Sequence, residues 1–227
     1  MKPGQVLTRW WQKLVAGGLL TPQDLYHEAR QENPDPAVWE RFFQLPDDEG
    51  WKAPERLKAP MWFSTNAYLL QGGKADWQFC DHRLMRWAAI FVELARRRGI
   101  PLYVHTAFRG MGEQQKAFDA GRSKATPGRS AHGIGEAVDI VHGALQWQLT
   151  PQEWQLLHVL GLRALDRLNA TLRKEDKLHL TWGGSFKALY DPAHWEISDY
   201  RSRLRVLNEG PPVRVMPRAI LRQKWYY

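Results

Sequence analysis

The sequence predicts an α+β domain in which a small antiparallel sheet packs with helices, preceded by a helical extension. Two long segments carry apolar residues at helical spacing, residues 76–99 and 150–174. Four short segments are rich in β-branched and aromatic residues, as strands are. These predicted strands are residues 101–108, 137–143, 178–185 and 194–198. Because long helices separate some of them, we expect a sheet of about four strands with helices on one side.

Residues 1–75 form the predicted N-terminal extension. Residues 5–45 have the pattern of three short helices, broken by glycine and proline. Residues 46–60 are polar and rich in proline, which favours a linker or an extended arm.

The central domain is predicted to cover residues 76–200. Its first long helix ends at Gly99, behind arginines whose charge suits a helix C-terminus. The following strand leads to Arg109, and residues 112–121 form a short helix. Residues 122–131 then make a basic, flexible loop.

The second long helix begins at a capping signal, with Thr150 as the N-cap and Glu153 three residues later. At the other end of the domain, residues 201–227 form a basic tail without clear periodicity until its last residues. Both this tail and the N-terminal helices are candidate binding segments for another protein.

The charge balance narrows the range of partners. Lys and Arg exceed Asp and Glu, so the formal net charge is +8 and the chain should be attracted to polyanions. No nucleic-acid-binding signature accompanies the charge, which disfavours nucleic acid. Anionic membrane surfaces and a carboxylate-rich cell wall both remain suitable partners, because charge alone does not choose between them.

The cysteine and tryptophan content and the length of the apolar runs limit the kinds of site and the cellular location that we expect. The single cysteine, Cys80, excludes an internal disulfide and a cysteine-rich zinc site. The 12 tryptophans suit either core packing or flat binding surfaces. The apolar run near the N-terminus is too short to span a membrane and lacks the order of a signal peptide, so we expect synthesis in the cytoplasm.

Two separate segments together suggest a metal site. Residues 130–139 read SAHGIGEAVD, and residues 191–196 read DPAHWE. Their histidines His132 and His194, with the carboxylate of Asp139, make a ligand set typical of catalytic zinc, which leaves a fourth position for water. Either histidine alone would more commonly be an ordinary hydrogen-bonded residue.

These two motifs resemble the zinc peptidases that cut the stem peptides of bacterial peptidoglycan. This family includes D-alanyl-D-alanine carboxypeptidases, L-alanyl-D-glutamate peptidases and phage endolysins. The resemblance covers about residues 76–200, and both motifs match in the right order.

The resemblance implies that His132, Asp139 and His194 bind one zinc ion and that Asp191 is the general base. Glu196 competes for the role of base, because side chains two apart on a strand share a face; it could equally orient His194.

The resemblance also implies the groups that contact substrate. Arg109 matches an arginine that stabilises the oxyanion, although Gly110 follows it where the family usually has a small hydroxyl residue. His105 stands upstream where none is expected. The implied substrate-binding residues are Ser130, Gln115, Trp182 and Trp195.

The order of the second motif, with Trp-Gly-Gly upstream, is more similar to the endopeptidase branch than to the carboxypeptidases. We therefore expect hydrolysis between L-Ala and D-Glu of peptidoglycan, with D-Ala-D-Ala cleavage as the alternative. A basic chain of this kind fits a bacteriolytic phage endolysin released by a holin or an enzyme carried in a virion. It fits equally a bacterial enzyme that acts on recycled muropeptides in the cytoplasm. The non-enzymatic alternative is a cell-wall or virion binding protein that retains the zinc site.

Overall fold

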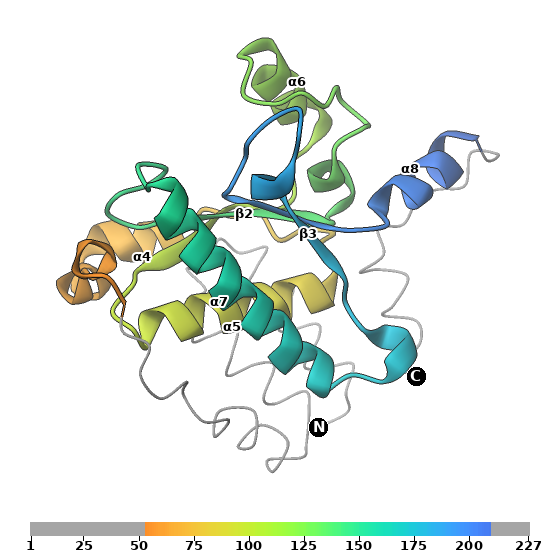
Figure 1. Cartoon of the computed structure of the whole chain (residues 1–227). Helices are drawn as coiled ribbons and strands as arrows, with labels where there is room; N and C mark the ends of the chain where they lie inside the picture. Colours follow the sequence, from red (N-terminus) through yellow and green to blue (C-terminus); the bar gives the residue numbers. More distant parts are fainter. Residues whose placement is uncertain (1–52, 210–227) are drawn as a thin grey trace, which may run out of the picture.

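The computed structural model describes residues 53–209. The three helices expected within residues 5–45 and the tail beyond residue 209 lie outside the described residues. Figure 1 shows the described part as a small sheet with helices on both of its sides, so the expectation of helices on one side only was wrong.

The sheet has four antiparallel strands in the order β1-β2-β4-β3. The strands are β1 (Leu102–Thr106), β2 (Ala137–His142), β3 (Leu180–Trp182) and β4 (His194–Ile197). All four coincide with predicted strands, so the α+β class is confirmed. In the centre of the sheet, Asp139 pairs with His194 and Val138 with Trp195. Because side chains alternate along a strand, these two pairs point to opposite faces.

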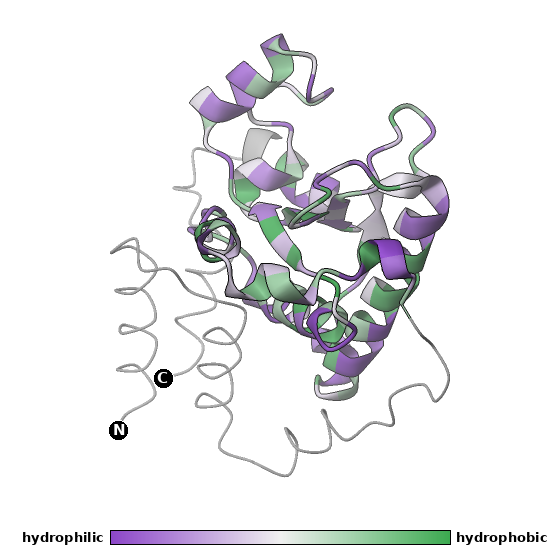
Figure 2. Cartoon of the chain, turned by 90° about the vertical axis from the view of Figure 1, so that its left-hand side faces the viewer, coloured by the Kyte–Doolittle hydropathy of each residue, from purple (hydrophilic) through white to green (hydrophobic). Residues whose placement is uncertain are grey.

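One face of the sheet packs on two long helices, α5 (His82–Arg96) and α7 (Pro151–Ala170). Figure 1 shows them crossing beneath the sheet. The buried indole of Trp87 on α5 donates a hydrogen bond of 2.9 Å to the carbonyl of Gly161 on α7. Trp195 fills the space between these helices and β4, with its ring centroid 4.9 Å from that of Trp87. In Figure 2 the hydrophobic colouring gathers between the elements and the hydrophilic colouring on outward helix faces.

The helix ends follow from local capping. Helix α5 begins later than predicted because the Asp81 side chain caps it, accepting the Arg83 amide N–H at 2.9 Å. Residues 76–81 therefore form a loop, and Cys80 is buried in it. For α7, the capping box of Thr150 and Glu153 is present as predicted.

The opposite face of the sheet carries the chain segments that build the site. They are α6 (Met111–Asp119) and the short 3-10 helix η3 (Ala131–Ile134). Two further 3-10 turns, η4 (Lys174–Asp176) and η5 (Gly183–Ser185), flank β3.

The folded unit is wider than the predicted domain of residues 76–200. Before it come η1 (Glu55–Leu57), η2 (Pro60–Ser64) and α4 (Asn66–Gly72). Leu57 is fully buried in the main core, and the Tyr68 hydroxyl donates a hydrogen bond of 3.0 Å to the carbonyl of Leu102. These residues therefore belong to the domain rather than to a linker, because their apolar side chains complete its core.

After β4 the chain continues as helix α8 (Tyr200–Glu209), where the sequence predicted an irregular tail. Tyr200 and Leu204 are buried with Ala131 and Ala137 in a small second apolar cluster. The Arg203 guanidinium forms a bidentate ion pair with Glu136, whose carboxylate is almost fully buried. This tertiary packing stabilises α8, whose short and mostly polar sequence does not by itself predict a helix.

No helix within residues 53–209 has the length and apolar character needed to cross a membrane.

Candidate metal centre

His132 lies on η3 and is held by the backbone of the chain after β1. Its Nδ1 is 2.7 Å from the carbonyl oxygen of Ala107. A carbonyl can only accept a hydrogen bond, so Nδ1 carries the proton and Nε2 presents a lone pair.

His194 is oriented in the same way by a carboxylate. Its Nε2 is 3.1 Å from Oε2 of Glu196, which is buried. The ionised carboxylate accepts the Nε2 proton, so the Nδ1 lone pair of His194 faces the other way. As predicted, His194 and Glu196, two apart on β4, share a face.

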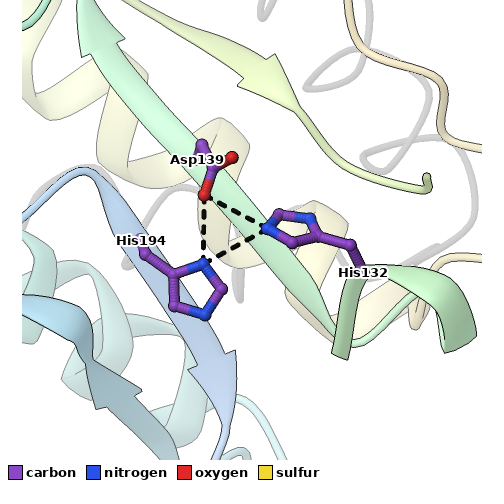
Figure 3. A group of neighbouring side chains, drawn as sticks. All are labelled: His132, Asp139 and His194. Atoms are coloured by element: carbon purple, nitrogen blue, oxygen red, sulfur yellow. Dashed lines mark hydrogen bonds and ion pairs between the residues drawn. The ribbon is translucent and has the colours of Figure 1, made fainter. Parts of the chain in front are cut away.

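Asp139 on β2 lies directly across from His194 in the sheet. We call His132, Asp139 and His194 the cluster. Oδ1 of Asp139 is 3.0 Å from Nδ1 of His194 and 3.2 Å from Nε2 of His132. The two histidine nitrogens are 3.2 Å apart. Figure 3 shows the three side chains converging from separate elements.

The chemistry of these three donors fits a metal cation. In a tetrahedral zinc site, ligands at 2.0–2.1 Å lie roughly 3.3 Å from one another. The three observed separations of 3.0–3.2 Å are close to that value. Two imidazole lone pairs and a carboxylate would repel one another unless a proton or cation lay between them. His132, Asp139 and His194 could therefore hold a metal ion.

Titration of the cluster follows from the same geometry in the metal-free protein. Burial lowers the pKa of His194, but its hydrogen bonds with Asp139 and Glu196 outweigh burial and raise the pKa to about 10. For Asp139, burial acts to raise the pKa, while the charges and hydrogen bonds of His132 and His194 hold it well below its usual range.

Asp191 lies beside the cluster, in the turn before β4. Its amide N–H donates to the carbonyl of Gly183 at 3.2 Å, and its carbonyl accepts from the His194 N–H at 3.1 Å. Burial first, and then the negative charge of Asp139, raises the pKa of Asp191. The charges of His194, His132 and Arg109 oppose this rise.

The backbone of Gly183 fits closely against that turn. A Cβ on Gly183 would lie 2.3 Å from the Asp191 carbonyl oxygen, so only glycine allows this approach.

Arg109 reaches the cluster from the loop after β1. One guanidinium nitrogen is 3.4 Å from Oδ2 of Asp139, and the other is 3.2 Å from Oε1 of Gln114. Arg109 is thus positioned beside the carboxylate oxygen that faces away from the two histidines.

The expectation for Gln115 does not fit the structure. Gln115 is exposed on α6 and donates to Asp119 at 2.7 Å, whereas its neighbour Gln114 is buried and contacts Arg109. Helical geometry gives the reason, because consecutive residues point about 100° apart and only one can face the sheet. Gln114 shares the buried face of α6 with Ala117, three residues on, and this spacing is the signal that could have identified it.

The two tryptophans also do not form the expected substrate surface. Trp195 is 2% exposed and belongs to the helix-facing side of β4, opposite His194. Trp182 is 9% exposed, stacks on His158 with ring centroids 4.1 Å apart, and donates to the Pro192 carbonyl at 2.8 Å. Both rings are used in packing. Ser130, by contrast, is buried directly before η3, next to the cluster in sequence.

The loop bearing His132 depends on Gly135. This residue has a φ of +68°, and a Cβ there would lie 2.1 Å from the Phe79 carbonyl oxygen. The Gly135 carbonyl accepts the Asp81 amide N–H at 2.9 Å, which ties the loop to the start of α5. The glycine is required both for the left-handed backbone and for this close approach.

Comparison with known proteins agrees with this site. Residues 123–197, which include all three cluster residues and Asp191, match the model of a peptidase family described as D-alanyl-D-alanine carboxypeptidase. The matched segment is about a third of the chain and contains the whole cluster.

Among solved structures, the crystal structure of the Serratia marcescens L-Ala D-Glu endopeptidase ChiX is similar, with 24% identity and a TM-score of 0.43. The similarity covers 55% of this chain and 85% of that chain. No curated protein matches the chain significantly.

Proposed function

We propose that this chain is a zinc-dependent peptidase that hydrolyses a peptide bond in the stem peptides of bacterial peptidoglycan. The observation that carries the proposal is the triangle of His132, Asp139 and His194, whose three donor atoms lie 3.0–3.2 Å apart within the segment that matches the peptidase family.

Zinc is the metal that this donor set suits best. Imidazole nitrogen and carboxylate oxygen are common zinc ligands, and three protein ligands are typical of a catalytic rather than a structural site. Bound zinc supplies a Lewis acid that activates water and polarises the peptide carbonyl.

Asp191 is our candidate for the general base, and Glu196 for the residue that orients His194. The Glu196 carboxylate is buried and engaged with Nε2 of His194, on the far side of the imidazole from the cluster. Asp191 is near the cluster without being one of the three donors, and its raised pKa brings proton acceptance closer to neutral pH. A carboxylate in this position takes a proton from the attacking water and passes it to the leaving amine.

Arg109 supplies positive charge for the transition state. Its guanidinium lies beside Asp139, and it can turn toward the negative charge that develops on the peptide oxygen. Gln114 holds the other side of the guanidinium, so we propose it as a positioning residue in place of Gln115. Ser130 remains a candidate for substrate contact.

The bond between L-Ala and D-Glu is the proposed point of cleavage. Support comes from the order Asp191, His194, Glu196 after Trp182-Gly183-Gly184, which resembles the endopeptidase branch. Cleavage of D-Ala-D-Ala is the second candidate, because the family description names that activity. A bacteriolytic phage endolysin, released by a holin or carried in a virion, is the biological setting that we propose.

Digestion of purified peptidoglycan tests these assignments. The wild-type protein loaded with zinc, the Asp191→Asn variant and a chelated sample are compared by mass spectrometry of the new termini. New N-terminal D-Glu in the wild type alone supports the endopeptidase, and free D-Ala supports the carboxypeptidase. Binding of zinc and of peptidoglycan without any new terminus would instead identify a non-catalytic wall-binding protein.

A further inference from the structure

The candidate base and one of the three donors are joined by a tight turn. The Asp191 carbonyl accepts the His194 amide N–H at 3.1 Å, so residues 191–194 form a β-turn closed by its own hydrogen bond. Pro192 is the second residue of this turn, a position that proline favours because its ring fixes φ. Since proline has no N–H, Pro192 can be anchored by hydrogen bonding only through its carbonyl.

The turn is fastened to the rest of the domain at each of its first three residues. The Asp191 amide N–H donates to the residue after β3 at 3.2 Å, and the Ala193 carbonyl accepts an amide N–H of β2 at 2.9 Å. Between them, the Pro192 carbonyl accepts the indole N–H of Trp182 at 2.8 Å. The middle of the turn is therefore held by a side chain, whereas the residues on either side of it are held by backbone groups.

Trp182 approaches the turn from the helix-facing side of the sheet. It is paired with Trp195 across β3 and β4, so these two side chains share a face, while His194 points to the face that carries the cluster. The indole extends along β4 as far as the turn that precedes this strand. The hydrogen bond therefore connects the packed side of the sheet with the segment that carries Asp191.

Contacts on the Trp182 ring fix the direction of its N–H. His158 of α7 stacks on the ring, with centroids 4.1 Å apart and planes 9° apart. Gly184 lies so close to the ring that a Cβ on this residue would overlap three of its atoms. A ring held in this way keeps one orientation, in which its N–H is directed at the Pro192 carbonyl.

We propose that Trp182 is a positioning residue for Asp191, because its indole N–H holds the turn from which the Asp191 carboxylate acts beside the cluster. This inference rests on the proposed function, in which Asp191 is the general base. A base must lie within hydrogen-bond reach of the water that it deprotonates, and this reach requires that the centre of the turn does not move. The tryptophan thus acts through Asp191 without touching the substrate.

Trp182→Phe tests this role, because it keeps an aromatic ring against His158 and removes the N–H that the Pro192 carbonyl accepts. We expect kcat for a soluble stem peptide to fall about 10- to 100-fold, since a small displacement of a catalytic group is costly. KM and zinc affinity should each change by less than about threefold, because the lost interaction serves the transition state alone.

This loss should not add to the loss of the base itself. In the Asp191→Asn background, Trp182→Phe should lower kcat by less than about twofold, because effects that pass through one group are not additive. A tryptophan with a merely structural role would lower kcat by the same factor in both backgrounds.

Trp87→Phe is the matched control. It removes an indole N–H from a buried bond of 2.9 Å to the Gly161 carbonyl, between α5 and α7 and away from the turn. It should destabilise the domain and keep kcat within about twofold of the wild type, because the turn retains its anchor.

His158→Ala reaches the same question without removing the N–H of Trp182. It deletes the ring on which the indole stacks, so we expect kcat to fall about threefold, and His158→Phe should restore most of it. If Trp182→Phe does not fold, the comparison in the Asp191→Asn background is made with His158→Ala.

Amide hydrogen exchange of the zinc-loaded protein follows the turn independently of catalysis. The N–H groups of Asp191 and His194 should exchange about tenfold faster in Trp182→Phe than in the wild type, and at the wild-type rate in Trp87→Phe. Amides of α5 report unfolding of the whole domain and serve as the reference.

The two readouts distinguish the possible failures. Unchanged exchange of the turn, an unchanged kcat, or an equal loss of kcat in the Asp191→Asn background would each overturn the role of Trp182. Faster exchange of the turn in Trp182→Phe, combined with a wild type that cleaves no stem peptide, would overturn the proposed peptidase activity and support the anchoring of the turn by Trp182.

Discussion

At the scale of single residues, the orientation of two imidazoles determines what the site can bind. Ala107 and Glu196 each accept the proton of one histidine, so that the other ring nitrogen of each histidine faces Asp139 as a lone pair. The ability of the site to bind a metal therefore depends on two groups that are not among its three donors.

The first prediction concerns Glu196→Gln. An amide can donate as well as accept, so the proton of His194 is no longer confined to Nε2, and Nδ1 is less available to the metal. We expect zinc affinity to fall about 10- to 100-fold, as measured by competition with a chelator. Glu175→Gln, at an exposed residue, serves as the control and should leave the affinity unchanged. Equal affinities for the two variants would exclude an orienting role for Glu196.

The second prediction concerns pH in the metal-free protein. The pKa of His194 is raised to about 10 in the folded state, above its usual 6.5, so protonation stabilises the fold. This contribution is complete below about pH 6.5 and is lost as the pH rises through 10, amounting to a few kcal/mol at order of magnitude.

Urea unfolding of chelated protein at several pH values measures this effect. The free energy of unfolding should fall from pH 6.5 toward pH 10 in the wild type, and this fall should be much smaller in His194→Asn. His179→Gln, at an exposed histidine, should keep the wild-type slope. A wild-type slope in His194→Asn would contradict the assignment.

At the scale of elements, glycines let separate segments approach the site. The loop with η3 packs its backbone on the start of α5 at Gly135, and β3 packs on the turn before β4 at Gly183. These contacts set the positions of His132 and Asp191.

The third prediction is that Gly135→Ala destabilises the protein by roughly 2–4 kcal/mol, because the new Cβ would overlap the Phe79 backbone and favour a different φ. Zinc affinity should fall as well, since the loop carries His132. Gly112→Ala on α6 is the control, because its Cβ would meet nothing within 4 Å and should change stability by no more than about 1 kcal/mol. Similar unfolding midpoints for the two variants would contradict the prediction.

At the scale of the whole molecule, the cluster joins three elements that are far apart in sequence. One ligand comes from η3, one from β2 and one from β4. A metal that binds all three stabilises the folded state, because the unfolded chain does not present them together.

The fourth prediction follows from this linkage. Free zinc at about 100 times its dissociation constant should add about 2.7 kcal/mol to the free energy of unfolding, and should raise Tm by about 5–10 °C relative to chelated protein. Scanning calorimetry measures the shift, and His132→Ala should remove most of it. A wild-type Tm that does not respond to zinc would exclude the proposed site.

The sequence by itself determined the class of the fold, all four strands of the sheet and the three residues of the cluster. Local patterns suffice for these features, because strand propensity and the capping box of α7 act over a few residues, and the motif around His132 keeps its spacing in the chain. The sequence did not determine α8 or the packing of residues 53–75. Those segments depend on contacts such as Arg203 with Glu136, which lie far apart in the chain.

Only the tertiary structure decided which side chains of a plausible motif face the cluster. Gln114 is buried against Arg109 while Gln115 is exposed, and Trp195 is buried in the core, because the phase of a helix or strand is set by what packs against it. The tertiary structure also left His105 of β1 unpaired beside Thr106, the partner of Asp139, because a β-bulge is a property of two paired strands and leaves no reliable signal in one of them.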